Sequence, residues 1–474
     1  MKFVNKKACF GVIIGTRGFF NPALCNSARK ELLETLDALS IDYIIGTEDQ
    51  TPNGAVETLE HAKLYAELFR KNAELIDGII VILPNFGDEL GVVETISRAK
   101  LNVPVMVQAC NDELDKVDVF SRRDAFCGKI SVCNNLYQYG IPFTDTTLHT
   151  CDITSPEFKD DLTKFSAICR TVRGLSNARI GAIGARPAAF QTVRFSEKLL
   201  QSAGITIIPV DLSEIFAVAE ALDNDSEKVK AKLSEIKAYG TIPSLIPEEQ
   251  ILRQTKFSVA VNDWMEENEC VASAIQCWTS MQENWGCASC LTMSMMGENL
   301  MPSACEVDIT GAVSMYALLL ASGEPPGFLD WNNNYGHETD KCVNTHCSNF
   351  PKSFIGATPE ISDLDILGET LGRENCFGAV KGKVTPGPMT YFRISTDDPR
   401  GKIKTYLGQG AFTDDPFDMD GGIAVCEVPG LRSLLTHICQ NGYEHHVAMV
   451  RGHVAGILKE SINKYLGWEL FHNS

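Results

Sequence analysis

The 474-residue sequence lacks any apolar run long enough to cross a membrane as a helix. Its first residues are basic and then apolar, as in a secretory leader, but the apolar run from Ala8 to Ile14 is short and no small-residue cleavage site follows it. Runs of basic residues interleaved with aromatic ones are also lacking, and the formal net charge is −19. These features argue against nucleic acid or an anionic membrane as a partner. We expect a cytoplasmic protein.

Nucleotide-binding motifs and disulfide patterns are lacking as well. The glycine-rich stretches GTRG, GAIGARP and GQGAF do not match GxGxxG between a strand and a helix, and no GxxxxGK[ST] occurs. Seventeen cysteines, an odd number, are scattered along the chain, which favours reduced thiols over a compact disulfide framework. The one CxxC pair, Cys287 and Cys290, has no second pair at zinc-finger spacing, so we interpret it as buried apolar thiols.

Predicted strands and helices alternate through the first two thirds of the chain, which indicates parallel βαβ units. After about residue 356, β-branched and aromatic residues alternate between Gly/Pro turns, as in antiparallel β structure. A long helix is predicted over 251–274 and a closing helix over 446–466. The fold class is therefore α/β, with two doubly wound α/β lobes followed by a β-rich C-terminal domain with a closing helix. The expected domains are 1–172 (N-terminal α/β), 173–355 (second α/β, with acidic metal ligands) and 356–474 (β-rich, with the histidine ligand).

Acidic residues flank an apolar segment in the middle of the chain. Glu306 and Asp308 precede the run 312–321, which predicts a buried helix, and Asp330 follows a short apolar strand. Carboxylates beside so apolar an element need a charge partner, because desolvating an unpaired carboxylate is costly. A divalent cation is one such partner. The alternative is that Glu306 and Asp308 only cap the helix, where negative charge is favoured.

Two adjacent histidines, His445 and His446, lie where the predicted closing helix begins. A helix N-terminus disfavours the imidazolium, which helps keep a histidine neutral as a metal ligand must be. Adjacent side chains diverge, so only one of the two readily points at a given ion. The alternative is a hydrogen-bonded pair at a domain junction. Glu306, Asp330 and one of these histidines would form an oxygen- and nitrogen-rich site for Mn²⁺ or a similar hard ion, suited to proton transfer on a polyol.

The motifs resemble those of the L-fucose/L-arabinose isomerase superfamily, most closely its fucose isomerase-like branch. The likeness rests on the 24-residue spacing from Glu306 in CEVDITGA to Asp330 in FLDWNN, on the His346-Cys347 pair and on the C-terminal GYEHHV. It extends over GTRGFFN, LPNFGDE, RRDAFCG, QCW at 276–278 and VKGKVTPGPMTYFR. Asp330 stands where the arabinose branch has glutamate, which follows the fucose-type choice.

The resemblance implies an aldose–ketose isomerase that transfers a proton through a cis-enediol and uses Mn²⁺. By position, Glu306 and Asp330 are metal ligands and the acid/base pair, and His446 is the third ligand, with His445 and His346 as alternative ligands or close neighbours of the metal. It implies three domains and a homo-oligomer, trimeric or hexameric, in which a neighbour's first domain completes each pocket. The expected sugar contacts are Arg17, Asn85, Gln276, Trp278 and Asn332.

Two other functions stay open at the level of sequence. One is isomerisation of a 6-modified hexose, such as a sulfonated one, with an arginine meeting the anionic group; these arginines equally suit salt bridges within an acidic chain. The candidates are Arg17, Arg122, Arg123 and Arg186. The other is a sugar-binding protein without catalysis, since two α/β lobes around a cleft also describe such proteins. The choice among Mn²⁺, Co²⁺ and Mg²⁺ is open too, because oxygen-rich sites discriminate by geometry and availability.

Overall fold

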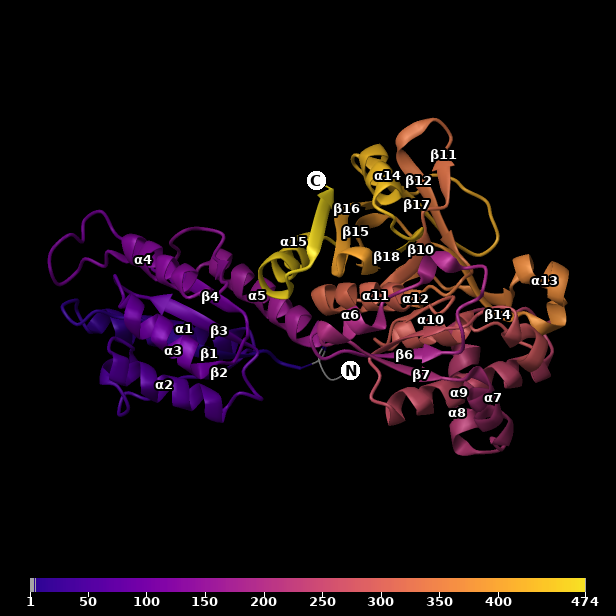
Figure 1. Ribbon diagram of the computed structural model, residues 1–474, viewed down its shortest axis with the longest axis horizontal. Helices are drawn as coiled ribbons and strands as arrows, with labels where there is room; N and C mark the ends of the chain where they lie inside the picture. The colour runs from indigo at the N-terminus through magenta and orange to yellow at the C-terminus, as the bar shows by residue number, and fades with distance from the viewer. Residues whose placement is uncertain (1–3, 5, 474) are drawn as a thin grey trace. The chain divides into compact units, whose positions relative to one another are not determined.

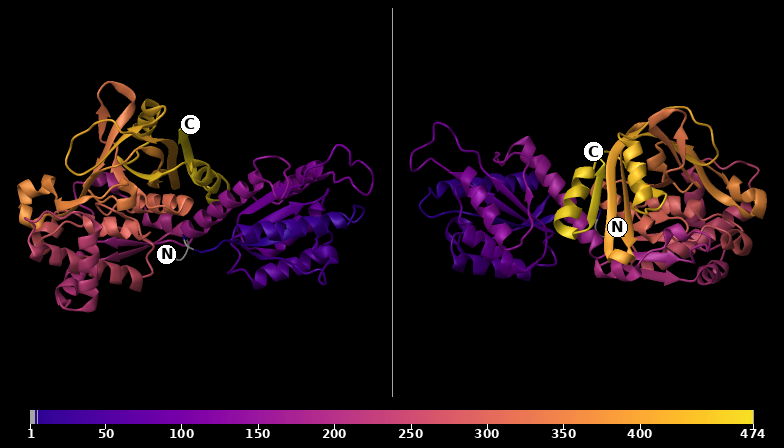
Figure 2. Two further views of the ribbon diagram at one scale, coloured as in Figure 1. Left: turned by 180° about the vertical axis from the view of Figure 1, so that it is seen from behind. Right: turned by 45° about the horizontal axis from the view of Figure 1, so that its top comes forward.

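The computed structural model describes residue 4 and residues 6–473, which form two compact units. The smaller unit comprises the chain up to Arg173 together with Asn463–Gly467, and the larger one comprises Gly174–Ile462 and the residues from Trp468 on. Figures 1 and 2 show the course of the chain through each unit. The mixed α/β class, with parallel sheets followed by a largely antiparallel one, is confirmed. The division into three domains stays a prediction.

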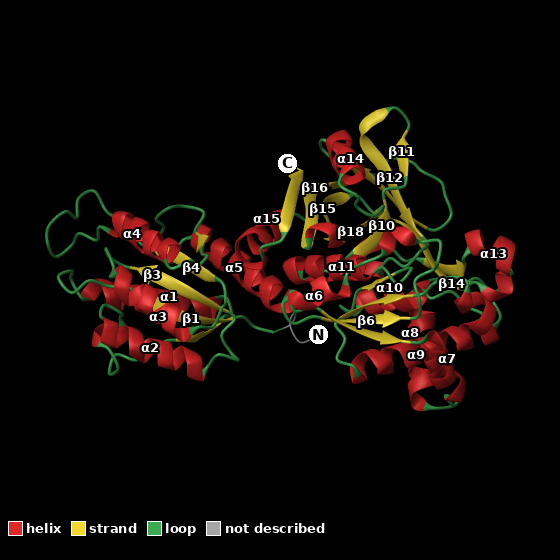
Figure 3. Ribbon diagram, in the orientation of Figure 1, coloured by secondary structure: helices red, strands yellow, loops and turns green. Residues whose placement is uncertain are grey.

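The smaller unit is a five-stranded parallel sheet with helices on both faces (Figure 3). Apolar side chains of α1 and α5 pack on one face, and those of α2, α3 and α4 pack on the other. Both faces are therefore covered, which explains near-continuous apolar strands such as GIIVIL. In sheet order the strands are β2 (Asp42–Ile44), β1 (Cys9–Ile14), β3 (Gly78–Leu83), β4 (Val105–Ala109) and β5 (Thr144–Asp145). The helices are α1 (Ala23–Ala38), α2 (Leu59–Lys71), α3 (Glu89–Ala99), α4 (Ala125–Gln138) and α5 (Pro156–Leu175).

The larger unit begins with a four-stranded parallel sheet. In sheet order its strands are β7 (Thr206–Val210), β6 (Arg179–Ile183), β8 (Ala272–Ile275) and β9 (Ser303–Ala304). Its helices are α6 (Glu197–Ser202), α7 (Leu212–Ala221), α8 (Glu227–Tyr239), α9 (Glu248–Glu267) and α10 (Cys290–Glu298). The helix predicted over 251–274 was too long. Helix α9 ends at Glu267, and the last residues of the predicted helix belong to strand β8. The left-handed φ of 53° at Glu269 turns the chain out of the helix.

The rest of the larger unit is organised by a ten-stranded, mainly antiparallel sheet. Its main path is β10 (Gly327–Asp330), β18 (His446–Arg451), β15 (Gly387–Asp397), β16 (Lys402–Phe412), β17 (Gly422–Glu427), β12 (Glu338–His346) and β11 (Asn333–Tyr335). Off this path are β13 (Glu360–Asp363), β14 (Phe377–Lys383) and β19 (Glu469–Asn473). Three helices belong to this part of the chain: α12 (Lys352–Ile355), α13 (Asp365–Leu371) and α14 (Leu431–Gln440).

The closing helix predicted over 446–466 was wrong in its first part. Residues His446–Arg451 form strand β18, and helix α15 covers only Ala455–Glu460 before a π-helical turn. The chain ends on β19, not on a helix. Strand β18 lies between β10 and β15, and its residues up to Val450 are buried. A strand buried on both faces has no polar alternation, so its apolar pattern resembles that of a buried helix.

Helix α11 (Ile309–Ser322) lies between the two sheets of the larger unit. It packs against β15 and β18 of the antiparallel sheet and against β8 and β9 of the parallel one. Every residue from Ile309 to Ala321 is buried, which explains why this helix is apolar all round. Asp308 caps its N-terminus by accepting from the Gly311 N–H, and Gly323 ends it with a φ of 79°. Among the described residues, neither this helix nor any other is long and apolar enough to cross a membrane.

We expect the packing of α11 to contribute strongly to the stability of the larger unit. Replacing the fully buried Leu319 by alanine should lower the free energy of unfolding by about 2–5 kcal/mol, because it removes buried methyl groups and leaves a cavity. All five tryptophans belong to the larger unit, so tryptophan fluorescence in a urea titration reports on that unit alone. The matched control is Leu245→Ala, at a side chain 77% exposed, which should change stability by less than about 0.5 kcal/mol. Equal effects of the two variants would contradict this account of α11.

Candidate metal centre

Glu306 lies in a tight turn between β9 and α11, and one of its two carboxylate oxygens has no partner. Oε1 accepts from the Trp278 indole N–H at 3.1 Å and from the Cys277 thiol at 3.3 Å. Oε2 is buried without a hydrogen bond. Glu306 and Val307 both adopt left-handed φ values, 55° and 54°, which non-glycine residues rarely take and which concentrate at functional sites. The turn thus fixes one oxygen and directs the other into the centre of the cluster.

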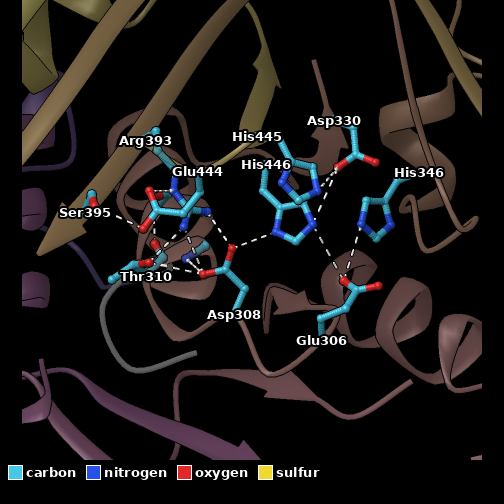
Figure 4. Close-up of polar contacts among 12 residues, drawn as sticks. Glu306, Asp308, Thr310, Asp330, His346, Arg393, Ser395, Glu444, His445 and His446 are labelled. Atoms are coloured by element: carbon cyan, nitrogen blue, oxygen red, sulfur yellow. Dashed lines mark hydrogen bonds and ion pairs between the residues drawn. The ribbon is translucent and has the colours of Figure 1, made fainter. Parts of the chain in front are cut away.

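Asp330 presents a second buried oxygen without a partner. It is the last residue of β10 and lies opposite His446 in the antiparallel register of β10 with β18. Its Oδ1 has no hydrogen bond and lies 3.5 Å from His446 Nε2, and Glu306 Oε2 lies 3.7 Å from that same nitrogen. Figure 4 shows the two carboxylates pointing toward the imidazole from different elements. Sheet pairing therefore brings together residues that are far apart in the sequence.

His446 is oriented by Asp308. Its Nδ1 lies 2.8 Å from Asp308 Oδ2, and since a carboxylate only accepts, the Nδ1 proton is donated to it. The neutral ring then has its lone pair on Nε2, facing Glu306 and Asp330. This carboxylate–histidine pairing is the arrangement that orients metal-binding histidines. A helix N-terminus was expected at this position, but none contributes to the orientation of His446, because this residue lies on a strand.

His445 takes a different environment from its neighbour. Its side chain is 42% exposed, its Nε2 lies 3.8 Å from Asp330 Oδ1, and its ring lies edge-on to Phe190. Burial of the ring, assisted by the adjacent His446, lowers the pKa of His445. His445 thus borders Asp330 alone, whereas His446 faces both carboxylates.

His346, at the end of β12, adds a third imidazole to the cluster. Its Nε2 lies 3.6 Å from Glu306 Oε2 and its Nδ1 lies 3.2 Å from the Cys347 sulfur. Burial by itself disfavours the imidazolium, yet the charges of Cys347 and Asp330 outweigh it and raise the pKa of His346 well above its ordinary value. The surroundings of this ring therefore attract positive charge.

Arg393 neutralises part of the negative charge behind His446. The fully buried guanidinium binds Asp308 through two hydrogen bonds of 2.7 and 3.0 Å. Its Nε lies 3.3 Å from Glu444 Oε2, and Ser395 donates to the other oxygen of Glu444 at 3.0 Å (Figure 4). Burial alone would raise the pKa of Asp308, but Arg393 and then His446 hold it well below its ordinary value.

The cluster has more negative charge than its own cations offset, even with His346 counted as protonated. Glu306, Asp308 and Glu444 are buried and Asp330 is partly so, whereas Arg393 is the one guanidinium in contact with them in the described chain. Unpaired buried carboxylates are strongly disfavoured. A divalent cation between Glu306 Oε2 and Asp330 Oδ1 would supply the missing charge and the missing partners.

The histidine–carboxylate distances are short enough for ligands of such an ion, and the ligand atoms form two groups that share His446: Glu306 with His346 and His446, and Asp330 with His445 and His446. Atoms about 2.1 Å from a common octahedral ion lie about 3.0 Å apart at right angles and about 4.2 Å apart across it. The distances of 3.5–3.7 Å from His446 Nε2 to the two carboxylates, and of 3.6 Å from His346 Nε2 to Glu306, fall between these limits. They are also too long for hydrogen bonds. Carboxylate oxygens with imidazole nitrogens suit Mn²⁺ and similar ions.

The expected sugar contacts of the larger unit have separate local roles. Gln276 Oε1 accepts from the Ala185 N–H at 2.9 Å and so holds the loop after β6. Trp278 holds Glu306 through its indole N–H. Asn332 lines a pocket of about 630 Å³ whose other walls include residues of α14; none of the carboxylates or histidines of the cluster lines it. The structure therefore places Trp278 in contact with the cluster and Asn332 in the wall of this other pocket.

The two expected sugar contacts of the smaller unit lie at the carboxyl ends of neighbouring strands. Arg17 follows β1, forms an ion pair with Glu89, donates to the Gly87 carbonyl and lies 4.4 Å from the Phe86 ring centre. Asn85 follows β3 and is fully buried; its amide donates to Thr16 at 2.9 Å and accepts from the Gly87 N–H. Both side chains therefore stabilise these loops.

Sequence reasoning missed Arg393, Glu444 and Phe190. A single arginine within the apolar stretch TYFRIST was a usable signal, because a central strand buries a charge only when it is paired. Glu444, directly before the two histidines, was a weaker one. Phe190 had no signal: its ring lies 5.5 Å from that of Trp278 and 5.9 Å from that of His446, contacts that exist only in the folded chain.

Removing Arg393 should destabilise the larger unit severely. We expect Arg393→Met to lower the free energy of unfolding by about 3–5 kcal/mol, because Asp308 and Glu444 then lose their buried partner. Urea unfolding followed by tryptophan fluorescence measures the loss. Arg373→Met is the control: it removes a side chain that is 55% exposed and pairs with Asp365 and Glu369, and should leave the free energy of unfolding nearly unchanged. A similarly small loss at Arg393 would contradict the network described above.

Comparisons with known proteins identify the family of this chain. Fucose/sulfoquinovose isomerase, N-terminal domain, matches residues 11–176, and L-fucose isomerase, C-terminal domain, matches residues 344–472. Sulfoquinovose isomerase from Priestia aryabhattai is 26% identical over 299 residues, 62% of this chain and 64% of the relative. That from Alkalicoccus urumqiensis is 27% identical over 297 residues, 61% of this chain and 64% of the relative. The alignments thus span just under two thirds of these relatives. The chain belongs to the fucose isomerase family.

Proposed function

We propose that the protein is an aldose–ketose isomerase that requires a divalent cation. The observation that supports this most is the approach of two buried, partnerless carboxylate oxygens, on Glu306 and Asp330, to the free nitrogen of His446. Membership of the fucose isomerase family supports the same chemistry. Glu306, Asp330 and His446 are the proposed metal ligands, with His346 as a fourth ligand or close neighbour.

Mn²⁺ is the proposed ion, because the ligand atoms are carboxylate oxygens and imidazole nitrogens. When bound, a divalent cation polarises the carbonyl and hydroxyl oxygens of a sugar and makes the adjacent C–H more acidic. The protein's own part is to hold the ligands in place. Asp308 fixes the His446 ring, while Trp278 and Cys277 fix one oxygen of Glu306.

Glu306 and Asp330 are the proposed acid/base pair. One carboxylate removes the proton from carbon 2 of the aldose and returns it to carbon 1, while the other carboxylate moves the hydroxyl proton from oxygen 2 to oxygen 1. The intermediate is a cis-enediol and the product is the ketose, so no hydrogen is gained or lost.

A sulfonated hexose is the proposed substrate. The relatives of this chain are named sulfoquinovose isomerases, which favours the 6-modified sugar over an unmodified one. Of the arginines considered for the anionic group, Arg17 and Arg122 form ion pairs with Glu89 and Asp124, and Arg123, in the smaller unit, donates to the Pro84 carbonyl. Arg186 belongs to the larger unit and donates to the carbonyls of Pro187 and Phe190, the latter a residue whose ring borders His446. Arg186 is therefore our first choice for the sulfonate contact.

We also propose a homo-oligomer, a trimer or hexamer, in which a neighbour's first domain completes the pocket. Large apolar side chains are exposed on two loops of the smaller unit, including Phe19 at 73% and Phe120 at 75%. The two loops are linked by a 3.0 Å hydrogen bond from Asn21 to the Phe120 carbonyl. Exposed apolar groups gathered in this way are typical of surfaces that another chain covers. A cytoplasmic location is proposed as well, in line with the free cysteines of the described chain.

The first test is ketose formation from a panel of pentoses, 6-deoxyhexoses and sulfoquinovose, with Mn²⁺ and with EDTA. We expect turnover of sulfoquinovose that needs the metal, with deuterium exchange from the solvent at carbon 2. Glu306→Gln should retain the fold and lose at least about 100-fold in kcat, because it removes both a metal ligand and a proton acceptor. Sugar binding that survives EDTA, without turnover of any sugar, would instead favour a binding protein. Full activity of Glu306→Gln would contradict the assigned role.

A matched pair of variants tests which of the adjacent histidines binds the metal. His446→Asn should weaken Mn²⁺ binding by more than about tenfold, since Nε2 of this ring faces both carboxylates. His445→Asn should leave the affinity nearly unchanged, because its ring is half-exposed and approaches Asp330 alone. Titration calorimetry with Mn²⁺ on both variants measures the difference. The reverse order of losses would assign the ligand to His445.

A further inference from the structure

Four cysteine thiols gather beside Glu306. They come from four separate segments: Cys277 follows β8, Cys290 begins α10, Cys305 follows β9 and Cys347 follows β12. The Cys305 and Cys347 sulfurs lie 3.3 Å apart, and the Cys277 sulfur lies 3.3 Å from Glu306 Oε1. β8 and β9 are neighbouring parallel strands, so Cys277 and Cys305 meet at the carboxyl ends of the sheet, where ligands bind in α/β folds.

The thiols are arranged around a common point that includes an oxygen of Glu306. The sulfurs of Cys277, Cys305 and Cys347 and one oxygen of Glu306 all lie within 4.8 Å of one another. Around a tetrahedral ion with bonds of about 2.3 Å to sulfur, the ligand atoms are about 3.8 Å apart. The observed separations of 3.3 Å for Cys305 with Cys347, and for Cys277 with Glu306 Oε1, need only small movements to reach this geometry.

Buried cysteines are usually small apolar side chains, and most cysteines of this protein fit that description. These differ because their sulfurs contact one another and a carboxylate. In the described part of the chain, the other two groups of metal-ligating side chains contain no cysteine. Nearby N–H groups also suit anionic ligands: Trp278 donates to Glu306 Oε1, and His346 Nδ1 lies 3.2 Å from the Cys347 sulfur.

We propose that Cys277, Cys305 and Cys347, together with Oε1 of Glu306, form a second cation site that takes a thiophilic divalent ion such as Zn²⁺. Thiolate ligands select Zn²⁺ over Mn²⁺ or Mg²⁺, so the two sites differ in the ions that they prefer. Glu306 belongs to both sites, with Oε1 toward the thiols and Oε2 toward the histidines. An ion among the thiols therefore acts directly on the carboxylate to which the catalytic role is assigned.

The test uses Co²⁺, whose absorption spectrum distinguishes tetrahedral thiolate coordination from a site of oxygen and nitrogen ligands. The full-length protein is stripped with EDTA, kept reduced with a phosphine and titrated with Co²⁺. We expect a sulfur-to-cobalt charge-transfer band together with strong visible bands, and their loss on addition of Zn²⁺. Absence of these bands while Co²⁺ binds would overturn the proposal.

Single substitutions locate the ion. Cys305→Ala and Cys347→Ala should each abolish the thiolate bands. Cys287→Ala is the matched control, since this thiol is also fully buried and lies three residues before Cys290, but is outside the group around Glu306. The thiolate bands should persist in the Co²⁺-loaded Cys287→Ala variant. Persistence of the bands in Cys305→Ala and Cys347→Ala would overturn the assignment. Circular dichroism tests whether each variant is folded. If an alanine variant is unfolded, the corresponding serine variant, Cys305→Ser or Cys347→Ser, takes its place.

A further variant separates this proposal from the isomerase assignment. His446→Asn should lose the metal-dependent turnover but retain the thiolate bands, because His446 is not among the thiol ligands. Loss of the bands in His446→Asn would mean that Co²⁺ binds among the histidines and would contradict a separate thiol site. Zn²⁺ added to the Mn²⁺-loaded wild-type enzyme should lower its turnover, and Cys347→Ala should resist that loss. Thiolate bands in a protein that isomerises no sugar would leave the thiol site supported and the proposed function refuted.

Discussion

The buried pairing of Asp308 with Arg393 and His446 is the interaction on which the centre of the larger unit depends. Asp308 caps helix α11, binds the Arg393 guanidinium with both oxygens and accepts a hydrogen bond from His446. One carboxylate thus joins the helix between the sheets to strands β15 and β18 of the antiparallel sheet. Removing either charge would leave the other buried and unpaired, which is far more costly than the loss of a surface ion pair.

The chemistry that we propose follows from this pairing. Because Asp308 fixes the Nδ1 side of His446, the Nε2 side has a constant direction, and the partnerless oxygens of Glu306 and Asp330 face it. Arg393 is already bound to Asp308 and Glu444, so it cannot also offset those two carboxylates. The folded chain therefore stabilises a site that lacks positive charge. In our proposal a divalent cation would complete this site and supply a Lewis acid for proton transfer at carbon.

The sequence predicted much of this region because its signals are local or nearly so. An apolar run of the right length between capping residues predicted α11, and the cap interpretation of its acidic residues is confirmed for Asp308, whereas the metal interpretation stays a prediction. Asp308 caps the helix, while Glu306 faces the histidines. The residues that sequence reasoning missed act across long separations: Arg393 is 85 residues from Asp308 and 51 residues from Glu444. No spacing rule connects such pairs, because the register of the sheet brings them together.

The most direct measurement is anomalous X-ray scattering from crystals of the protein grown with Mn²⁺, recorded on both sides of the manganese absorption edge. Our account predicts a single manganese peak bounded by Glu306 Oε2, Asp330 Oδ1 and His446 Nε2, with the Asp308 hydrogen bond to His446 retained. A manganese peak elsewhere in the chain would contradict it. So would Glu306 and Asp330 oxygens that find protein partners in the crystal and leave no peak between them.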